Sequence, residues 1–351
     1  MSDKKFDTLV FIGRLQPMTI AHKAVIDKAL KNAHEVVVVL GSCFQPRSTK
    51  NPFTFEERKA MIEAVYPTAN IKIVGVRDYP YDDNAWVSAV QNAVNGAVAS
   101  SGWTDFPKKI GLIGHSKDSS SYYLKIFPQW RNHVEVENVD GINATDIRNA
   151  LFEISEPSKT FDLMPFPAAK VLHYFILDNA EIGGVWDWFH NEYREIKEYR
   201  EKSQMKGFNF PSVFVTTDAV LTQSGYILLI KRGGFPFKDC WALPGGYLDK
   251  GQFVVDNMIK ELREETCVKI PAKVLKGSIK DVQIFDHPDR DPRGRVITHG
   301  FHIDLGYPDE KLPKVKSGDD AKEARWFHLS EVTSEMMAFD HYSIISHFIR
   351  I

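Results

Sequence analysis

The sequence predicts an α/β domain with a doubly wound parallel sheet, followed by a smaller α+β domain. At 351 residues the chain exceeds the commonest length of a single domain. In the first half, short apolar runs alternate regularly with helical patterns, which is typical of a parallel sheet covered by helices. The second half mixes strands and helices less regularly. The charged run EYREIKEYREK lies between them, so we expect domains at 1–185 and 207–351 with a linker at 186–206.

In the first domain the apolar runs are rich in Val and Ile, as in buried parallel strands. Strands are expected at 9–12, 36–40, 71–76, 110–113 and 134–136. The segments between them have helical length and spacing at 21–33, 55–66, 85–100 and 144–154. Right-handed crossovers would place any ligand at the carboxyl ends of these strands.

In the second domain two strands are expected at 213–220 and 226–231, joined by the turn-like sequence TQSG. A helix is expected at 253–265 and further strands near 296–305. This order gives a mixed α+β pattern.

The composition excludes several classes of protein. It is 43% hydrophobic and 26% charged with a net charge of −2, so no overall basic field favours nucleic acid or an anionic membrane. No recognition helix, signal peptide or apolar stretch of about 18 residues is present. Cys43, Cys240 and Cys267 form no CxxC pair, which favours a reducing, cytoplasmic setting. A homo-oligomer is compatible with these features.

The segment Gly13–His22 follows the first strand and precedes the first helix. Thr19 and His22 are three residues apart, on one face of the helix start, where unpaired N–H groups favour a phosphate. An imidazole there adds a hydrogen-bond donor for a transferring phosphoryl group. A lone TxxH is more often a helix cap followed by a surface histidine, so the interpretation depends on the neighbouring motifs.

Two segments resemble the nucleotidyltransferase superfamily. GRLQPMTIAH resembles its GRFQPxHxGH signature, with Thr19 at the first His, and Ile142–Arg148 resembles its late ISxTxxR motif. The resemblance implies a Rossmann-like fold in which Thr145 caps a helix, Arg148 holds the ATP phosphates, and Gly13 and Gln16 belong to the binding loop.

Residues 41–58 and 81–86 are similar to the NMN adenylyltransferase branch, in its archaeal-type form. By that resemblance Arg14 and Arg47 hold phosphates, while Asn84 and Trp86 receive the nicotinamide, the indole by stacking. Trp86 is equally consistent with a core position. The implied reaction joins nicotinamide mononucleotide (NMN) and ATP into NAD, with Mg²⁺ on the ATP phosphates and Thr19, His22 and Arg148 as catalytic residues.

The second constellation is WALPGGYLDKGQ followed by KELREETCV. It resembles the Nudix box GX5EX7REUXEEXGU, and Glu261, Glu264 and Glu265 stand at its metal-ligand positions, with Glu264 as catalytic residue. Such carboxylates suit Mg²⁺ or Mn²⁺, which would activate a water on a diphosphate. An acidic helix face alone is more often simply solvated.

Three residues depart from the Nudix pattern: Gln252 replaces Glu, Lys260 replaces Arg and Cys267 replaces Gly. The pair Gln252 and Lys260 would keep one hydrogen bond and lose a bidentate ion pair. Two interpretations follow for this domain, an active hydrolase or an inactive sensor of an NAD metabolite.

Residues 289–298 and 317–327 resemble ADP-ribose pyrophosphatases, which implies cleavage of ADP-ribose to AMP and ribose 5-phosphate with Arg232 and Arg295 in substrate binding. A charged surface loop is the alternative interpretation of either segment. For the first domain, transfer to another phosphate ester is a further alternative, and Asn84 and Trp86 speak against it.

Overall fold

The computed structural model describes residues 4–100, 109–114, 126–130, 133–136, 142–153, 158–203, 212–306, 311–318 and 321–350. The chain forms two compact units, Met1–Tyr193 and Arg194–Ile351. The boundary lies within one helix, α7 (Val185–Ser203). Residues 186–203 of the expected linker are therefore helical, whereas 204–206 lie outside the described residues.

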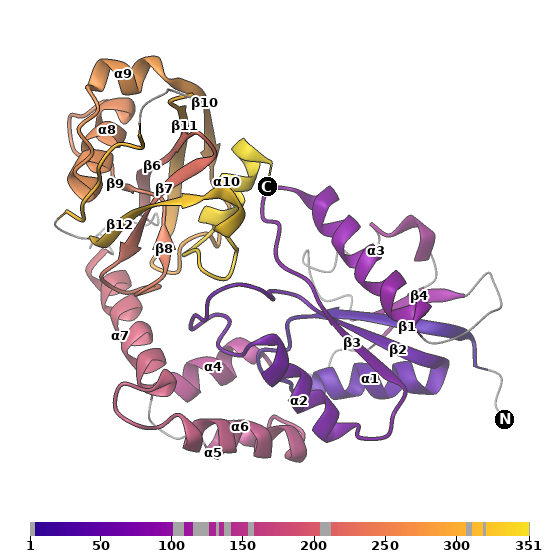
Figure 1. The fold of residues 1–351 in the computed structure, drawn as a ribbon. Helices are drawn as coiled ribbons and strands as arrows, with labels where there is room; N and C mark the ends of the chain where they lie inside the picture. The colour runs from indigo at the N-terminus through magenta and orange to yellow at the C-terminus, as the bar shows by residue number, and fades with distance from the viewer. Residues whose placement is uncertain are drawn as a thin grey trace. The chain divides into compact units, whose positions relative to one another are not determined.

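The first unit is built on a parallel five-stranded sheet with the order β3-β2-β1-β4-β5 (Figure 1). Its strands are β1 (Phe6–Gly13), β2 (Ala33–Leu40), β3 (Ile71–Gly75), β4 (Ile110–Gly114) and β5 (His133–Glu135). Its helices are α1 (Ile20–Asn32), α2 (Phe55–Val65), α3 (Asp83–Ala99), η2 (Pro128–Trp130), α4 (Ala144–Phe152), α5 (Ser158–Phe161) and α6 (Phe166–Asp178). The strand order reverses between β1 and β4, where open α/β sheets bind ligands.

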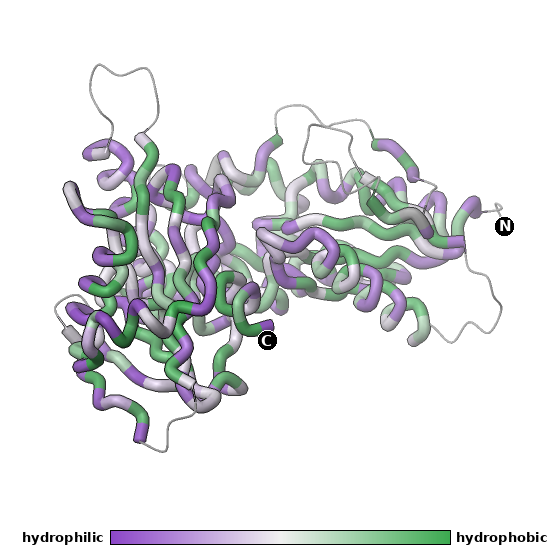
Figure 2. The backbone as a smooth tube through the Cα atoms, turned by 90° about the horizontal axis from the view of Figure 1, so that it is seen from above, coloured by the Kyte–Doolittle hydropathy of each residue, from purple (hydrophilic) through white to green (hydrophobic). Residues whose placement is uncertain are grey.

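Alternation along the central strands separates two cores. Leu9 and Phe11 of β1 pack with α1, α2 and α4, whereas Val10 and Ile12 pack with α3. Because neighbouring side chains of a strand point to opposite faces, both faces of this strand are buried, as the apolar runs predict. Figure 2 shows hydrophobic residues concentrated along these strands.

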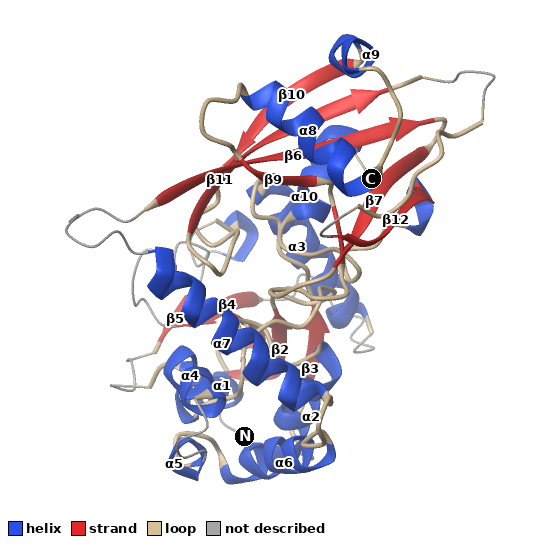
Figure 3. Ribbon diagram, turned by 90° about the vertical axis from the view of Figure 1, so that its left-hand side faces the viewer, coloured by secondary structure: helices blue, strands red, loops and turns tan. Residues whose placement is uncertain are grey.

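The second unit holds a mixed sheet with the order β10-β11-β6-β7-β12, with β9 paired to β6 and β8 to β7 (Figures 1 and 3). Its strands are β6 (Val213–Gln223), β7 (Tyr226–Arg232), β8 (Trp241–Ala242), β9 (Gly245–Tyr247), β10 (Ile279–Phe285), β11 (Arg295–Asp304) and β12 (Ala321–His328). Its helices are α8 (Val254–Thr266), α9 (Ala272–Gly277), η3 (Leu329–Glu331) and α10 (His341–Ile349). β6 and β11 run parallel, whereas β6 and β7 form an antiparallel hairpin.

Opposite faces of this sheet carry α8 and α10. Phe301 of β11 packs in one cluster with Leu262 of α8, whereas the next residue, His302, stacks on Phe348 of α10. The β6–β7 turn is made by Ser224 and Gly225, which both have positive φ. Two left-handed residues in a row match the twist of a hairpin, and they occupy the second half of the predicted TQSG turn.

The expected strands and helices are confirmed in type, with two differences. Ala33, expected to end a helix, starts β2. The cap of α4 is Asn143, whose side chain accepts the Thr145 N–H, so the expectation that Thr145 caps this helix was wrong. An Asn side chain satisfies a first-turn N–H as well as Thr does, and Asn143 stands in the extended conformation that a cap requires. No helix among the described residues has the length and apolar character needed to cross a membrane.

Each unit should unfold with its own core. Ile26 is fully buried between α1 and the sheet, so Ile26→Ala should lower the free energy of unfolding of the first unit by about 2–5 kcal/mol. Hydrogen exchange resolved by peptide should show faster exchange in β1 and β2, with no change in β6 and β11. Equal acceleration in both units would contradict two separate cores.

Candidate active sites

The start of α1 is organised by a capping box between Thr19 and His22. The Thr19 side chain accepts the His22 N–H at 3.3 Å, and His22 Nδ1 accepts the Thr19 N–H at 3.0 Å. Because Nδ1 is an acceptor, the neutral ring carries its proton on Nε2, which is then a hydrogen-bond donor. Thr19 and His22 lie together at the helix start as expected, and Thr19 is the helix cap that the alternative interpretation describes.

Arg148 and Gln16 join the late motif to the early one. Arg148 is 5% exposed, and it donates to the Gln16 carbonyl at 2.6 Å and to Thr145 Oγ1 at 3.0 Å. Burial, with the Arg14 charge as a smaller cause, lowers the pKa of Arg148 to about 10, so the guanidinium is cationic at neutral pH. The Gln16 side chain exchanges two hydrogen bonds with the backbone of Phe53 and is therefore committed to the loop.

A second buried arginine, Arg58 on α2, was not singled out from the sequence. Its side chain is 1% exposed and donates at 2.7 Å to the carbonyls of Arg14 and Gly41, which follow β1 and β2. It also lies 2.9 Å from Cys43 Sγ. Burial lowers the pKa of Arg58 and raises that of Cys43. Arg58 thus ties together the two strand ends beside the expected phosphate site.

The remaining expected residues of this site lie in different surroundings. Arg47 makes a bidentate ion pair with Glu57, at 2.8 and 2.6 Å, and donates to the Pro52 carbonyl. Arg14 and Asn84 are exposed. Trp86 is half-buried and its ring lies 5.8 Å from that of Phe127, so part of it belongs to the core.

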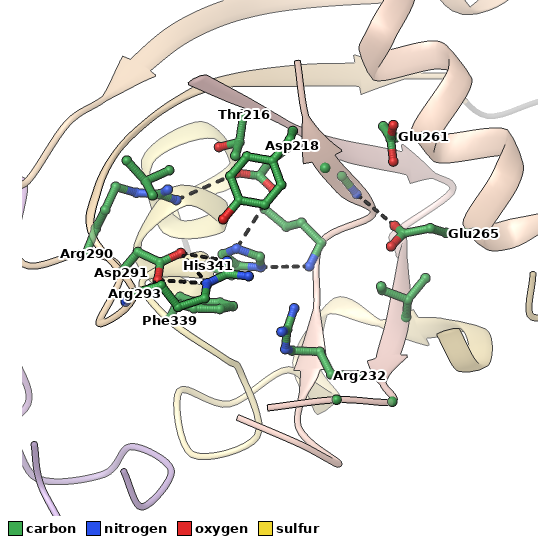
Figure 4. Close-up of a pocket in the computed structure, with 18 residues that line it drawn as sticks. Thr216, Asp218, Arg232, Glu261, Glu265, Arg290, Asp291, Arg293, Phe339 and His341 are labelled. Carbon is green, nitrogen blue, oxygen red and sulfur yellow. Dashed lines mark hydrogen bonds and ion pairs between the residues drawn. The ribbon is translucent and has the colours of Figure 1, made fainter. Parts of the chain in front are cut away.

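The second unit contains a cavity of about 520 Å³ (Figure 4). One side is formed by Glu261 and Glu265 of α8, and the opposite side by Arg290, Arg293 and Phe339. The lining residues are Thr216, Asp218, Ile230, Arg232, Gly233, Gly234, Leu243, Gly245, Gly246, Tyr247, Glu261, Glu265, Arg290, Asp291, Arg293, Val296, Phe339 and His341. Carboxylates facing arginines suit a phosphate ester that binds together with a cation.

The two glycines of the LPGG segment are required by close approach. A Cβ on Gly245 would lie 2.1 Å from the Thr217 carbonyl oxygen of the neighbouring strand. A Cβ on Gly246 would lie 2.4 Å from Glu261 Oε2. Gly245 also donates its N–H to Glu265 Oε2 at 2.8 Å, so this loop positions both carboxylates.

Two of the three expected metal ligands face the cavity. Burial raises the pKa of Glu261 and raises that of Glu265 to about 8, and the charge of Glu261 adds to the effect on Glu265. Glu264 is 56% exposed on its side chain, pairs with Lys260 and does not line the cavity. Helix geometry separates Glu264 from the other two. Glu265, four residues after Glu261, lies nearer to it around the helix than Glu264, which is three residues after it.

A divalent cation in this cavity needs carboxylate ligands such as Glu261 and Glu265, which face the cavity from α8. Among the described residues no three His, Cys, Asp or Glu side chains form a ready-made set of ligands. Mg²⁺ commonly binds through one or two carboxylates plus substrate phosphates and waters. Glu261 and Glu265 offer hard carboxylate oxygens that face the cavity from one helix, so the pair fits such an ion.

The sequence suggested a hydrogen bond between Lys260 and Gln252. In the structure Lys260 pairs with carboxylates instead. Its ammonium group lies 2.9 Å from Asp249 and 3.2 Å from both Glu261 and Glu264. These hydrogen bonds raise the pKa of Lys260. Gln252 is exposed, and Asp249, three residues earlier, supplies the carboxylate partner instead.

A buried network supports the arginine side of the cavity. Arg290 pairs with both carboxylate oxygens of Asp340 at 2.9 Å, and Thr298 donates to Asp218 at 2.7 Å. His341 Nδ1 accepts the Leu243 N–H, and burial lowers the pKa of His341 to about 3, so the ring is neutral. Burial lowers the pKa of Arg232 and raises that of Asp218.

The sequence pointed to the arginine-rich segment 289–298 but not to the arginines of that segment that line the cavity. Arg232 lines the cavity as expected, whereas Arg295 pairs with Asp286 and lies outside the lining. Arg290 and Arg293, which lie in the same segment 289–298, line the cavity instead. Asp218, Asp340 and His341 carried no local signal, because only the pairing of distant strands and α10 brings them here.

Gly246→Ala should separate metal binding from stability. The new methyl group meets the flexible end of Glu261 and not backbone, so the fold should tolerate it while Glu261 moves. Titration with Mn²⁺, followed by electron paramagnetic resonance, should show about 10- to 100-fold weaker binding in the second unit. Gly277→Ala, where no atom lies within 4 Å, is the matched control. Unchanged Mn²⁺ affinity would remove Glu261 from the metal site.

Two family models match the chain, one to each unit. The cytidylyltransferase-like model matches residues 10–150, and the NUDIX domain model matches residues 213–348.

Similar proteins match each half and the whole. A nicotinamide/nicotinic acid mononucleotide adenylyltransferase of Acinetobacter baylyi is 44% identical over 153 residues, 42% of this chain and 77% of that protein. An ADP-ribose pyrophosphatase of Methanocaldococcus jannaschii is 39% identical over 158 residues, 45% of this chain and 80% of that protein. A crystal structure from Francisella tularensis, a bifunctional NMN adenylyltransferase/ADP ribose pyrophosphatase with AMP and a manganese ion, covers 98% of this chain and 99% of its own with a TM-score of 0.86 and 30% identity. With a similar protein that matches nearly the whole chain and a family model that matches each unit, this protein belongs to the family of bifunctional NMN adenylyltransferases and ADP-ribose pyrophosphatases.

Proposed function

We propose that this protein makes NAD from NMN and ATP in its first unit and hydrolyses ADP-ribose to AMP and ribose 5-phosphate in its second. The observation that carries the proposal is the presence of both sites in one chain, each with a distribution of charged side chains that suits its reaction. Buried arginines stand at the strand ends of the first unit, and paired carboxylates face arginines in the second. Whole-chain similarity to a bifunctional protein supports the same conclusion.

In the first unit the chain's own groups would position phosphates. The NMN phosphate attacks the α-phosphorus of ATP, a P–O bond forms, and the bond to the β-phosphate oxygen breaks to release pyrophosphate. His22 Nε2–H and the α1 amino terminus would donate to the transferring group, and Arg148 and the exposed Arg14 would neutralise the triphosphate. Arg47 would contribute only if it left Glu57.

Asn84 and Trp86 would receive the nicotinamide. Half-burial of Trp86 against Phe127 would hold the indole while its remaining surface stacks on the pyridinium. Thr145 would act through Arg148, to which its hydroxyl is bonded.

In the second unit Glu261 and Glu265 would hold the divalent cation, which when bound polarises the diphosphate and activates a water. We infer Mg²⁺ as the usual ion, with Mn²⁺ as a substitute, and Glu264, which shares Lys260 with Glu261, as a carboxylate that joins when substrate binds. Arg232, Arg290 and Arg293 would hold the phosphates and sugars. Hydrolysis would form a bond from the water oxygen to one phosphorus and break the bond from that phosphorus to the bridging oxygen, which would leave with the other product and take up the proton that the water gives up.

The setting of these reactions is part of the proposal. Three cysteines without a disulfide among the described residues fit a reducing cytoplasm. NMN, ATP and ADP-ribose are the proposed small-molecule partners, and neither nucleic acid nor a membrane is expected. Incubation of the pure protein and Mg²⁺ with NMN plus ATP, or with ADP-ribose, followed by product identification, tests both activities directly.

His22→Ala should lower the rate of NAD formation by about 100- to 1000-fold, because one donor to the reacting phosphates is lost. ADP-ribose hydrolysis by the same preparation should be unchanged. His173→Ala, at an exposed histidine of α6, is the control for general effects of removing an imidazole. A turnover rate within about threefold of the original at saturating ATP and NMN would exclude His22 from catalysis.

Glu261→Gln should lower ADP-ribose hydrolysis by at least about 100-fold, because a charged metal ligand becomes a neutral amide. NAD formation should continue at its original rate. Glu323→Gln, at an exposed position of β12, is the matched control. Hydrolysis that persists in Glu261→Gln with an unchanged metal requirement would rule out this carboxylate as a ligand.

A further inference from the structure

The last turns of α7 contact residues that line the cavity of the second unit, although these turns precede the segment that the NUDIX model matches, 213–348. Tyr199 donates from its hydroxyl to the hydroxyl of Tyr247 at 2.6 Å. The two rings are nearly parallel, at 13°, with centroids 6.5 Å apart. Tyr247 lines the cavity and Tyr199 does not, so Tyr199 stands directly behind a lining residue.

Arg293 is held by the same group of rings. Its guanidinium lies 5.4 Å from the Tyr199 ring, 5.5 Å from that of Tyr247 and 5.4 Å from that of Phe339. Asp291 fixes its orientation with hydrogen bonds at 2.7 and 3.0 Å. Asp291 thus occupies the Nε and Nη2 edge of the guanidinium, whereas Nη1 makes no hydrogen bond to the described residues and can donate to a ligand.

The neighbouring residue of α7 strengthens this attachment. Arg200 Nε donates at 2.8 Å to the carbonyl of Pro292, between Asp291 and Arg293. Two consecutive residues of α7 therefore hold the loop 291–293. Arg200 holds the loop backbone, and Tyr199 contacts the Arg293 side chain.

We propose that Tyr199 is a positioning residue of the Nudix cavity, which holds Tyr247 and Arg293 in place for the part of the substrate that lies away from the metal. The proposal rests on ADP-ribose being bound in this cavity. Figure 4 shows Arg293 and Phe339 on the side opposite Glu261 and Glu265. Loss of Tyr199 should therefore weaken substrate binding and leave the cleavage step intact, because the carboxylates have other supports.

The test is steady-state hydrolysis of ADP-ribose by the full chain with Tyr199→Ala and Tyr199→Phe. Tyr199→Ala removes a hydrogen bond and a ring, so KM should rise about 10-fold while kcat stays within about twofold. Tyr199→Phe keeps the ring and loses only the hydroxyl, so KM should rise about threefold. Tyr226→Ala, at a half-buried tyrosine of β7 outside the cavity, is the matched control and should leave KM unchanged.

Calorimetric titration of ADP-ribose without metal provides a second measurement. Weaker binding in Tyr199→Ala supports the proposal even if the unaltered protein releases no AMP, a result that would overturn only the proposed hydrolysis. Equal affinity and equal KM in both Tyr199 variants would overturn the positioning role. A loss of kcat at constant KM, together with a lower melting temperature, would reveal a structural role alone and overturn it as well. If Tyr199→Ala does not fold, KM of Tyr199→Phe decides.

Discussion

Buried guanidinium groups determine how both sites are built. Arg58 and Arg148 in the first unit and Arg290 in the second are 1%, 5% and 8% exposed. A guanidinium that leaves water must find partners for its N–H groups, or the cost exceeds the stability of a typical domain. The surrounding loops are therefore arranged around these side chains.

The partners differ between the units, and the difference suits the chemistry. Arg58 and Arg148 donate to carbonyls, which bring no net negative charge, so the strand ends of the first unit stay positive for a triphosphate. Arg290 is neutralised by Asp340, and the cavity beside it keeps an excess of carboxylates. A polyanion suits the first arrangement directly, whereas the second needs a metal ion to accompany the substrate.

The sequence predicted the fold well because its strongest signals are periodic. Buried parallel strands such as β1 and β2 are continuous apolar runs, and α8 carries its motif at helical spacing. Motif residues within one helical turn, such as Thr19 and His22, were expected on one face for the same reason, and they lie together at the start of α1. Arg58, Asp218 and His341 were not identified, since each acquires its neighbours only through tertiary packing.

Helix α8, which carries the three motif glutamates, shows what a motif match cannot predict. Gln252 and Lys260 stand at the Nudix-box positions of a Glu and an Arg that pair, so the sequence suggested that one hydrogen bond remains in place of an ion pair. The loop instead brings Asp249 to Lys260, and charge compensation is achieved by a residue outside the matched position. A motif defines the spacing of residues along the chain, whereas the path of a loop decides which side chain reaches a given partner.

Helix α7 holds one loop of the second unit through two consecutive residues. Tyr199 reaches Tyr247, and Arg200 reaches the Pro292 carbonyl. Consecutive residues of a helix project about 100° apart around its axis. One residue added between Tyr199 and Arg200 would therefore rotate one of the two side chains away from its partner. A flexible segment absorbs such a change, but a continuous helix cannot, so an insertion between these two residues should be tolerated less well than one in a loop.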